Sequence, residues 1–257
     1  MKNNFVHARG LTLIELVVVL MVLIALAGVL LPQFSGMLNR THTSAASTNF
    51  SEINKAITMY QIKTLMGYPN KLDVPVKSGN LSTLADTLEA GGPADMTIVA
   101  ADANQVASLS GNGIKTGYPL VPLATLQAAG NSATFAGDDL AAPIDYTTGT
   151  PPIVRISDAR AQKEFGPNLL GAAAPTPEMY VIFGLNDACT AIPSVMAQAP
   201  LHFDQVDPTV VYSRFFLVFA IPVTGGGTPF CRYVGSVGSE LSGYSGHLRD
   251  YYSPQSQ

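Results

Sequence analysis

Charge, cysteine and histidine are all scarce in this chain. Charged side chains make up 12% of its 257 residues, against about 25% in typical soluble domains. The formal charge of −4 gives no electrostatic reason to expect nucleic acid or an anionic lipid surface as a partner. Two cysteines are too few for a disulfide scaffold or a cysteine-based zinc site. Four histidines spread along the chain do not suggest a metal site either.

The motifs of common enzyme classes are also missing. There is no Walker loop, no HExxH pair and no SxxK motif. The sequence GYSGH at 243–247 begins like a nucleophile elbow, but His247 stands where the final glycine belongs. The sequence GNG at 111–113 fails the dinucleotide-binding pattern, because Thr116 occupies the place of the third glycine. We therefore predict no catalytic residue, no cofactor and no enzymatic activity.

Aspartates in two regions are the remaining candidates for a metal site. Carboxylate oxygens are the ligands that Ca²⁺ prefers. The spacing matches no calcium-binding loop, which favours solvated loops and predicts no metal. The residues concerned are Asp138, Asp139 and Asp145 in one region and Asp204 and Asp207 in the other.

What the chain does have is one long apolar run near its start. The sixteen residues from Leu16 to Leu31 carry no polar side chain, and adding 11–15 extends the run to 21. About 20 helical residues cross a bilayer core. Lys2 and Arg9 precede the run without any acid, which holds the N-terminus in the cytoplasm. The sequence thus predicts one membrane span and export of everything after it.

The residues alone leave three interpretations of this run open. A cleaved signal peptide could end after Ala25-Leu26-Ala27, although the apolar run continues beyond it. An uncleaved signal anchor needs no acid, yet Glu15 lies inside the run, where a carboxylate costs roughly 2.5–3.5 kcal/mol. The third interpretation is a helix used for assembly, in which the acid has a role.

The sequence GLTLIEL at 10–16 resembles the prepilin processing motif of type IV pilins and type II secretion pseudopilins. The resemblance is close over residues 10–34 only. It implies that a prepilin peptidase cuts between Gly10 and Leu11 and methylates the new N-terminus at Leu11, where the family usually has phenylalanine. Glu15 is then the fifth mature residue, where the family carries its glutamate.

The resemblance also implies how such a chain assembles. Glu15, with Thr12 beside it, would serve assembly by pairing with the N-terminal amino group of a neighbouring subunit. Gly28 and Pro32 are poor helix formers, and Pro32 should kink the helix. The implied partners are other pilin-like subunits, the prepilin peptidase and an inner-membrane assembly platform.

The expected fold class is α+β, with a long N-terminal helix packed on an antiparallel sheet. We expect a leader at 1–10, a transmembrane and assembly helix at 11–32, its amphipathic continuation at 33–66 and an extracytoplasmic globular domain at 67–257. Residues 74–150 have weak periodicity and would tolerate several folds. Helical candidates are 81–90, 102–109, 122–129 and 158–165, and strand candidates are 97–100, 153–156, 179–185, 213–221 and 232–237.

Cys189 and Cys231 could form one disulfide in an exported domain. Each lies next to the end of a candidate strand, and many type IV pilins resemble this in having one cysteine pair around a C-terminal loop region. The pair is therefore predicted to be bridged; two buried free thiols are the alternative.

Taken together, these patterns predict a structural subunit of a type IV pilus-like filament. It would lie in the inner membrane as a single-pass protein, with its globular domain outside the cytoplasm, before joining a filament in the periplasm or at the cell surface. The alternatives are a type II secretion pseudopilin and, from another class, a membrane-tethered enzyme or binding module.

Overall fold

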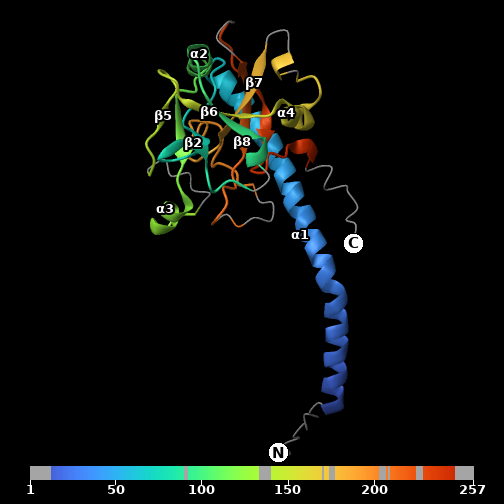
Figure 1. Cartoon of the computed structure of the whole chain (residues 1–257). Helices are drawn as coiled ribbons and strands as arrows, with labels where there is room; N and C mark the ends of the chain where they lie inside the picture. Colours follow the sequence, from blue (N-terminus) through green and yellow to red (C-terminus); the bar gives the residue numbers. More distant parts are fainter. Residues whose placement is uncertain are drawn as a thin grey trace, which may run out of the picture. The chain divides into compact units, whose positions relative to one another are not determined.

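The computed structural model describes residues 13–89, 92–132, 140–169, 171–173, 177–202, 207, 209–223 and 228–246. Within helix residues 29–40 and 42–43 only the backbone is described. The chain divides into two compact units, Met1–Thr41 and His42–Gln257. Figure 1 shows the elements in chain order by colour.

The first element, α1, runs from Leu13 to Lys63. Within the second unit its inner face is set by apolar residues at helical spacing: Phe50, Ile53 and Ile57 are at most 1% exposed. Immediately after its last residue, the Thr64 hydroxyl donates to the Tyr60 carbonyl oxygen at 2.8 Å. This face of α1 is thus part of the core of the second unit.

Within the described residues, nine strands form one mixed sheet. Eight of the nine follow the order β3-β6-β7-β1-β4-β5 with β8 and β9 extending from β7, and β2 pairs with β1. The strands are β1 (Leu72–Lys77), β2 (Asn80–Leu84), β3 (Met96–Ala100), β4 (Thr116–Leu120), β5 (Ile144–Asp145), β6 (Pro152–Ile156), β7 (Glu178–Gly184), β8 (Phe216–Pro222) and β9 (Arg232–Val237).

The sheet divides at β7. One edge of β7 pairs with β8 along its whole length. The other edge meets β6 at Tyr180 and Val181 and meets β1 at Gly184. Two arms therefore leave the same edge, β6–β3 on one side and β1–β4–β5 on the other, with β2 paired to β1. This division shapes the surface between the arms.

Short helices fill the connections between strands. They are α2 (Ala103–Gly111), α3 (Leu123–Ala128) and α4 (Asp158–Phe165), with 3-10 turns η1 (Pro93–Asp95) and η2 (Gly171–Ala173). Helix α4 lies beside β7 (Figure 1). Helix α2 begins with a capping box, in which Asp102 accepts from the Gln105 N–H at 2.9 Å while the Gln105 side chain accepts from the Asp102 N–H.

The core is centred on β8, every residue of which is buried. Aromatic rings in the core meet edge to face, because the positive edge of one ring is attracted to the negative face of the next. The ring centroids of Phe50 and Phe215 lie 4.9 Å apart, and those of Tyr68 and Phe219 lie 5.0 Å apart. One apolar cluster thus joins α1 to the central strands.

The expected fold of one long helix on an antiparallel sheet is wrong. The sheet is mixed, because β1 and β4 run parallel, with Leu72 opposite Gly117. The chain from 78 to 115 supplies the crossover that a parallel pair requires. Further helices also stand between the strands, and β2 replaces the helix expected at 81–90.

The predicted single-pass inner-membrane location is also contradicted. Among the residues that the structure describes, no helix is both long enough and apolar enough to cross a membrane.

Candidate assembly surface

The N-terminal part of α1 presents an apolar surface to solvent. From Leu13 to Leu26 all the large apolar side chains are exposed, between 39% at Val17 and 82% at Leu13. The sequence LIELVVVLMVLIAL contains no glycine or proline, so nothing interrupts the helix before Gly28. We call residues 13–26 the assembly segment.

The assembly segment is apolar on all sides. Consecutive apolar residues are exposed, whereas an amphipathic helix has its apolar residues at every third or fourth position, on one buried face. An apolar surface of this kind marks an interaction site. A single groove would cover one side only, so the pattern favours a partner arrangement that surrounds the helix.

Glu15 is the one charged residue in the assembly segment. It lies in the first turn of α1 as described, where the helix dipole favours a negative charge. A carboxylate amid apolar side chains is costly to bury unless a positive charge or hydrogen-bond donors lie close to it.

The other residues predicted to serve processing and assembly have different outcomes. Gly10, Leu11 and Thr12 lie outside the described residues. Gly28 lies within α1, and nothing comes within 4 Å of the position that a Cβ atom would take. Pro32 also lies in α1, in the part where only the backbone is described. The kink expected from these two residues stays a prediction.

The predicted disulfide is absent: Cys189 and Cys231 are free thiols. The strand register explains this. Cys189 follows the Gly184 end of β7, and its neighbour Thr190 bonds Asn70, just before β1. Cys231 precedes Arg232, which pairs with Ala220 toward the other end of β8. The sequence places each cysteine next to a strand end, but it does not reveal that the two strand ends lie at opposite ends of β8.

Burial keeps both thiols protonated. It raises the pKa of Cys189 to about 12 and raises that of Cys231 as well. Since the thiolate is the reactive form, neither cysteine has the surroundings of a nucleophile.

Two of the candidate calcium ligands, Asp145 and Asp207, accept hydrogen bonds within local turns. Asp145 accepts hydrogen bonds from the N–H and hydroxyl of Thr147 at 2.8 and 2.7 Å. Asp207 does the same with Thr209 at 2.9 and 2.7 Å. These bonds lower the pKa of both carboxyls. Asp138, Asp139 and Asp204 lie outside the described residues, and among the described ones no cluster suited to a metal occurs.

The loop that resembles a nucleophile elbow instead binds α4. The Gly243 N–H donates to a carboxylate oxygen of Glu164 at 2.7 Å, and the Ser245 hydroxyl donates to the Glu164 carbonyl oxygen at 3.3 Å. Ser245 is thus engaged with the helix backbone, which is a structural role.

A buried polar cluster was not foreseen from the sequence. Asp73 on β1 is fully buried and accepts from the Tyr212 hydroxyl at 2.7 Å and from the Asn186 amide at 2.6 Å. Gly184, paired with Asp73, leaves room for the tyrosine hydroxyl. Asp73 lies more than 100 residues before each of its two donors, so no local pattern could have brought them together.

Comparison with known proteins adds no relative. No protein-family model matches the chain, and neither a curated protein nor a solved structure matches it.

Proposed function

We propose that this chain is a structural subunit of a filament of the type IV pilin-like class. It is processed between Gly10 and Leu11 and assembles through the N-terminal part of α1. The motif at 10–16 supports the processing step. The assembly step is supported by the apolar surface of the assembly segment.

That exposed surface is the observation that carries the proposal. Leaving such a surface in water is unfavourable by about 25 cal/mol for each Å². Identical helices packed side by side cover one another on all sides, because each presents the same apolar surface to several neighbours. The occupant is therefore the same segment of other copies.

The role of Glu15 follows from this packing. Once surrounded by apolar helices, its carboxylate is stabilised by a positive charge placed close to it. The amino group that cleavage creates at Leu11 of an adjacent copy has the right charge. Pairing of this kind sets the axial position of one subunit against the next.

The test combines electron microscopy with mass spectrometry. The full chain, produced together with a prepilin peptidase, is sheared from the cells and examined for filaments. The expected result is filaments whose subunit begins at N-methylated Leu11. A mature N-terminus at Gly28 would indicate an ordinary signal peptide and contradict the proposal.

A matched pair of variants isolates the apolar surface. Val18→Ser and Leu23→Ser together should abolish filaments, because both side chains are more than half exposed and would be buried on assembly. Lys55→Ser, on the exposed face of the same helix within the second unit, should leave filaments intact. Filaments formed normally by the double variant would refute assembly through this segment.

A further inference from the structure

An exposed apolar patch lies where α1 ends, within the second unit. It consists of Met59, Ile62, Leu65 and Met66, which are 59%, 73%, 90% and 71% exposed. Met59 and Ile62, three positions apart, share one side of the helix, and the other two follow in the turn after it. None of the four is buried, so the core gains little from them. We call these four residues the exit patch.

The turn that carries the exit patch has an unfavourable backbone. It closes with a hydrogen bond from the Met66 N–H to the Gln61 carbonyl oxygen at 2.7 Å, and glycine is the usual residue in the left-handed position of such a helix end. Here Leu65 has a φ of 56° and Met66 a φ of 79°, which leucine and methionine adopt at a steric cost. Glycine in place of Leu65 would remove both the strain and the exposed side chain. This combination points to a use for the leucine outside the fold.

The charges around the exit patch are positive. Residues 56–72 contain two lysines, Lys63 and Lys71, and no acid. Lys115 joins them from the start of β4, because its N–H donates to the Asn70 side-chain oxygen at 2.9 Å. All three lysines are exposed, and we call them the lysine rim. The formal charge of −4 for the whole chain therefore does not describe this surface.

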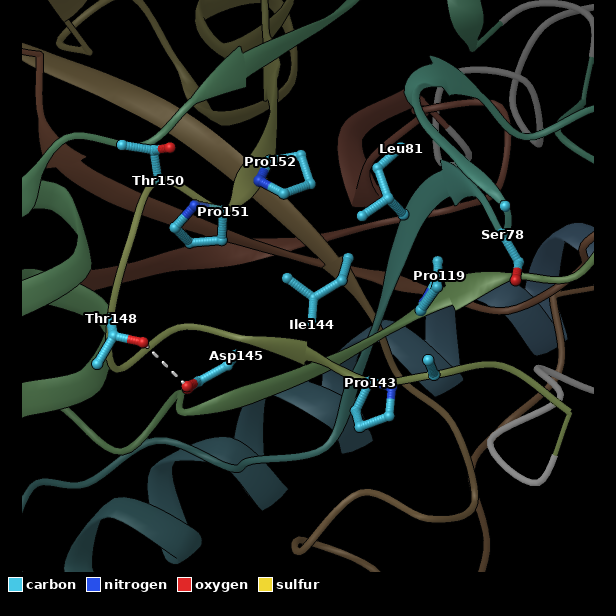
Figure 2. Close-up of a pocket in the computed structure, with 12 residues that line it drawn as sticks. Ser78, Leu81, Pro119, Pro143, Ile144, Asp145, Thr148, Thr150, Pro151 and Pro152 are labelled. Atoms are coloured by element: carbon cyan, nitrogen blue, oxygen red, sulfur yellow. Dashed lines mark hydrogen bonds between the residues drawn. The ribbon is translucent and has the colours of Figure 1, made fainter.

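Neighbouring acids are engaged elsewhere. Glu52 binds Lys55 at 3.0 Å. Asp145, which lies on β5 opposite Thr116, accepts hydrogen bonds from Thr147 and from Thr148, the second of which Figure 2 shows. Within the described part of the chain, no member of the lysine rim forms a salt bridge. The rim is therefore available to negative groups of a partner.

This combination of side chains distinguishes between classes of partner. Apolar side chains flanked by exposed lysines match the two layers of an anionic bilayer surface, which has acyl chains beneath and phosphate headgroups above. Flexible methionine and leucine side chains at a protruding turn would need a shaped hollow on a protein partner, whereas a fluid bilayer requires no matching shape. Each lysine near an anionic bilayer strengthens binding about fivefold.

We propose that the exit patch inserts into the surface of an anionic lipid bilayer, with the lysine rim on the headgroups. The inference goes beyond the proposed function and does not depend on it. A few side chains reach the boundary between headgroups and acyl chains, and no helix has to cross the bilayer.

A fluorescent probe within the exit patch tests this contact in the full chain. Met66→Cys is labelled with a dye whose emission shifts to the blue in apolar surroundings, and phosphatidylglycerol vesicles are added. The expected result is a blue shift, with quenching by spin labels near the top of the acyl chains. The position of the dye matters, because the assembly segment could hold the chain on a vesicle without bringing residue 66 into it. Unchanged emission at residue 66 would overturn the proposal.

A second dye position controls for adhesion of the whole chain to the vesicle. Leu81→Cys replaces an exposed leucine of β2, beyond the other end of β1 from the exit patch. Its emission should not change. The unmodified chain, treated with the same dye, gives the background from Cys189 and Cys231. Equal shifts at residues 66 and 81 would show general adhesion and overturn the proposal.

The lysine rim is tested by removing its charge. Lys63→Gln and Lys71→Gln together should raise the lipid concentration for a half-maximal shift about 25-fold. Lys77→Gln is the matched control, because this lysine already pairs with Asp86 at 3.1 Å and lies at the other end of β1. An equal response to uncharged phosphatidylcholine vesicles would contradict recognition of an anionic surface.

Leu65→Gly separates insertion from folding. It relieves the left-handed strain, so the melting temperature of the full chain should not fall. Since the change also removes the most exposed apolar side chain, the lipid concentration for a half-maximal shift should rise about tenfold. A lower melting temperature together with weaker insertion would give Leu65 a structural role and overturn the proposal.

Two further outcomes identify other partners and separate this inference from the proposed function. A blue shift that grows with protein concentration in the absence of vesicles would show contact between copies and overturn the lipid assignment. Filaments without insertion reject the lipid contact alone, and insertion without filaments rejects the filament function alone.

Discussion

Gly184 shows how one missing side chain can determine a buried network. A Cβ atom at this position would collide with the Tyr212 hydroxyl and lie 2.9 Å from the Asp73 Cβ. That hydroxyl is one of the donors to the buried Asp73 carboxylate. Glycine is therefore required by packing at this position, where β1 and β7 meet.

The first prediction concerns Gly184→Ala. It should lower the free energy of unfolding by about 1–3 kcal/mol, since the Tyr212 hydroxyl must move. In a Tyr212→Phe background the closest clash, that with the hydroxyl, is removed while the contact with the Asp73 Cβ remains, so the loss from the double change should be smaller than the sum of the single losses. Urea unfolding measures all three. Gly111→Ala, with nothing within 4 Å of its Cβ position, is the control, and it should not lower the free energy of unfolding. Additive losses would contradict the argument.

The second prediction concerns the cysteines. Both thiols are free, Cys189 is buried and Cys231 is partly buried, and burial raises the pKa of both, so they should be alkylated slowly in the native protein, Cys189 the more slowly. Both should then be alkylated in denaturant without any reductant. Mass spectrometry of the intact chain counts the labels. An unlabelled denatured chain would mean that the bridge exists after all.

The third prediction concerns Glu15. Its replacement by leucine or glutamine should leave the amount of full-length protein unchanged, while filaments disappear. Glu15→Asp keeps the charge and should restore part of the assembly. Counting sheared filaments against total subunit measures the effect. Filaments from Glu15→Leu at the normal level would refute the pairing role.

Individual elements differ in how far the sequence foretold them. Helix α4 matches its expected bounds, because Ser157 caps it and Gly166 follows it. Strands β7 and β9 were found from their apolar residues, and both lie within a residue of expectation. Local signals suffice where both the ends and the interior of an element are marked.

Strands β1 and β4 escaped prediction for a physical reason. Each contains a proline, Pro75 and Pro119, and β4 also contains Gly117. Proline removes a ladder donor, so such segments read as loops. Gly117 is needed because a Cβ there would meet Val74 at 2.5 Å and Tyr146 at 2.8 Å. Only the tertiary contacts reveal these segments as strands.

The candidate site was only partly foreseeable. The sequence indicated the apolar run and Glu15, and the structure added that the described side chains are exposed on every side. The turn that follows α1 could not be predicted, because Leu65 and Met66 adopt left-handed backbone conformations there that leucine and methionine disfavour.

The fourth prediction concerns the start of α2. Asp102→Ala removes the acceptor for the Gln105 N–H and should lower the free energy of unfolding by about 1 kcal/mol. Gln105→Ala should cost more, because its amide also donates to the Pro222 and Val223 carbonyl oxygens at the end of β8. Thermal unfolding ranks the two variants. The reverse order would show that the cap outweighs the link to β8.

At the scale of the whole molecule, the fifth prediction is a loss of stability at both extremes of pH. Burial tends to raise the pKa of Asp187, but hydrogen bonds from Arg214 and the Ala199 N–H outweigh burial, so the pKa is lowered. Because the pKa of Asp187 is lower in the folded protein than in the unfolded chain, where it is about 3.9, the ionised carboxylate stabilises the fold above that pH. This stability is lost as the pH falls from the unfolded pKa through the folded pKa.

The alkaline side has the opposite cause. Burial raises the pKa of Tyr180 to about 12 and also raises that of Tyr146 and Tyr233. In the unfolded chain tyrosines lose their protons near pH 10, so rising pH favours unfolding. Urea midpoints across the pH range measure both limbs. Asp187→Asn should flatten the acid limb by no more than about 1 kcal/mol, since the carboxylate is partly exposed, and should leave the alkaline limb unchanged.

The hydrogen bond between the Tyr233 hydroxyl and Asn54 joins residues 179 positions apart. At ribosomal rates of 5–20 residues per second, about 10–40 s separate the synthesis of the two partners. During that interval the inner face of α1 has no β8 or β9 to pack against. A chaperone that binds nascent apolar helices would therefore find this chain early, and ribosomes stalled before β8 should carry protease-sensitive chains.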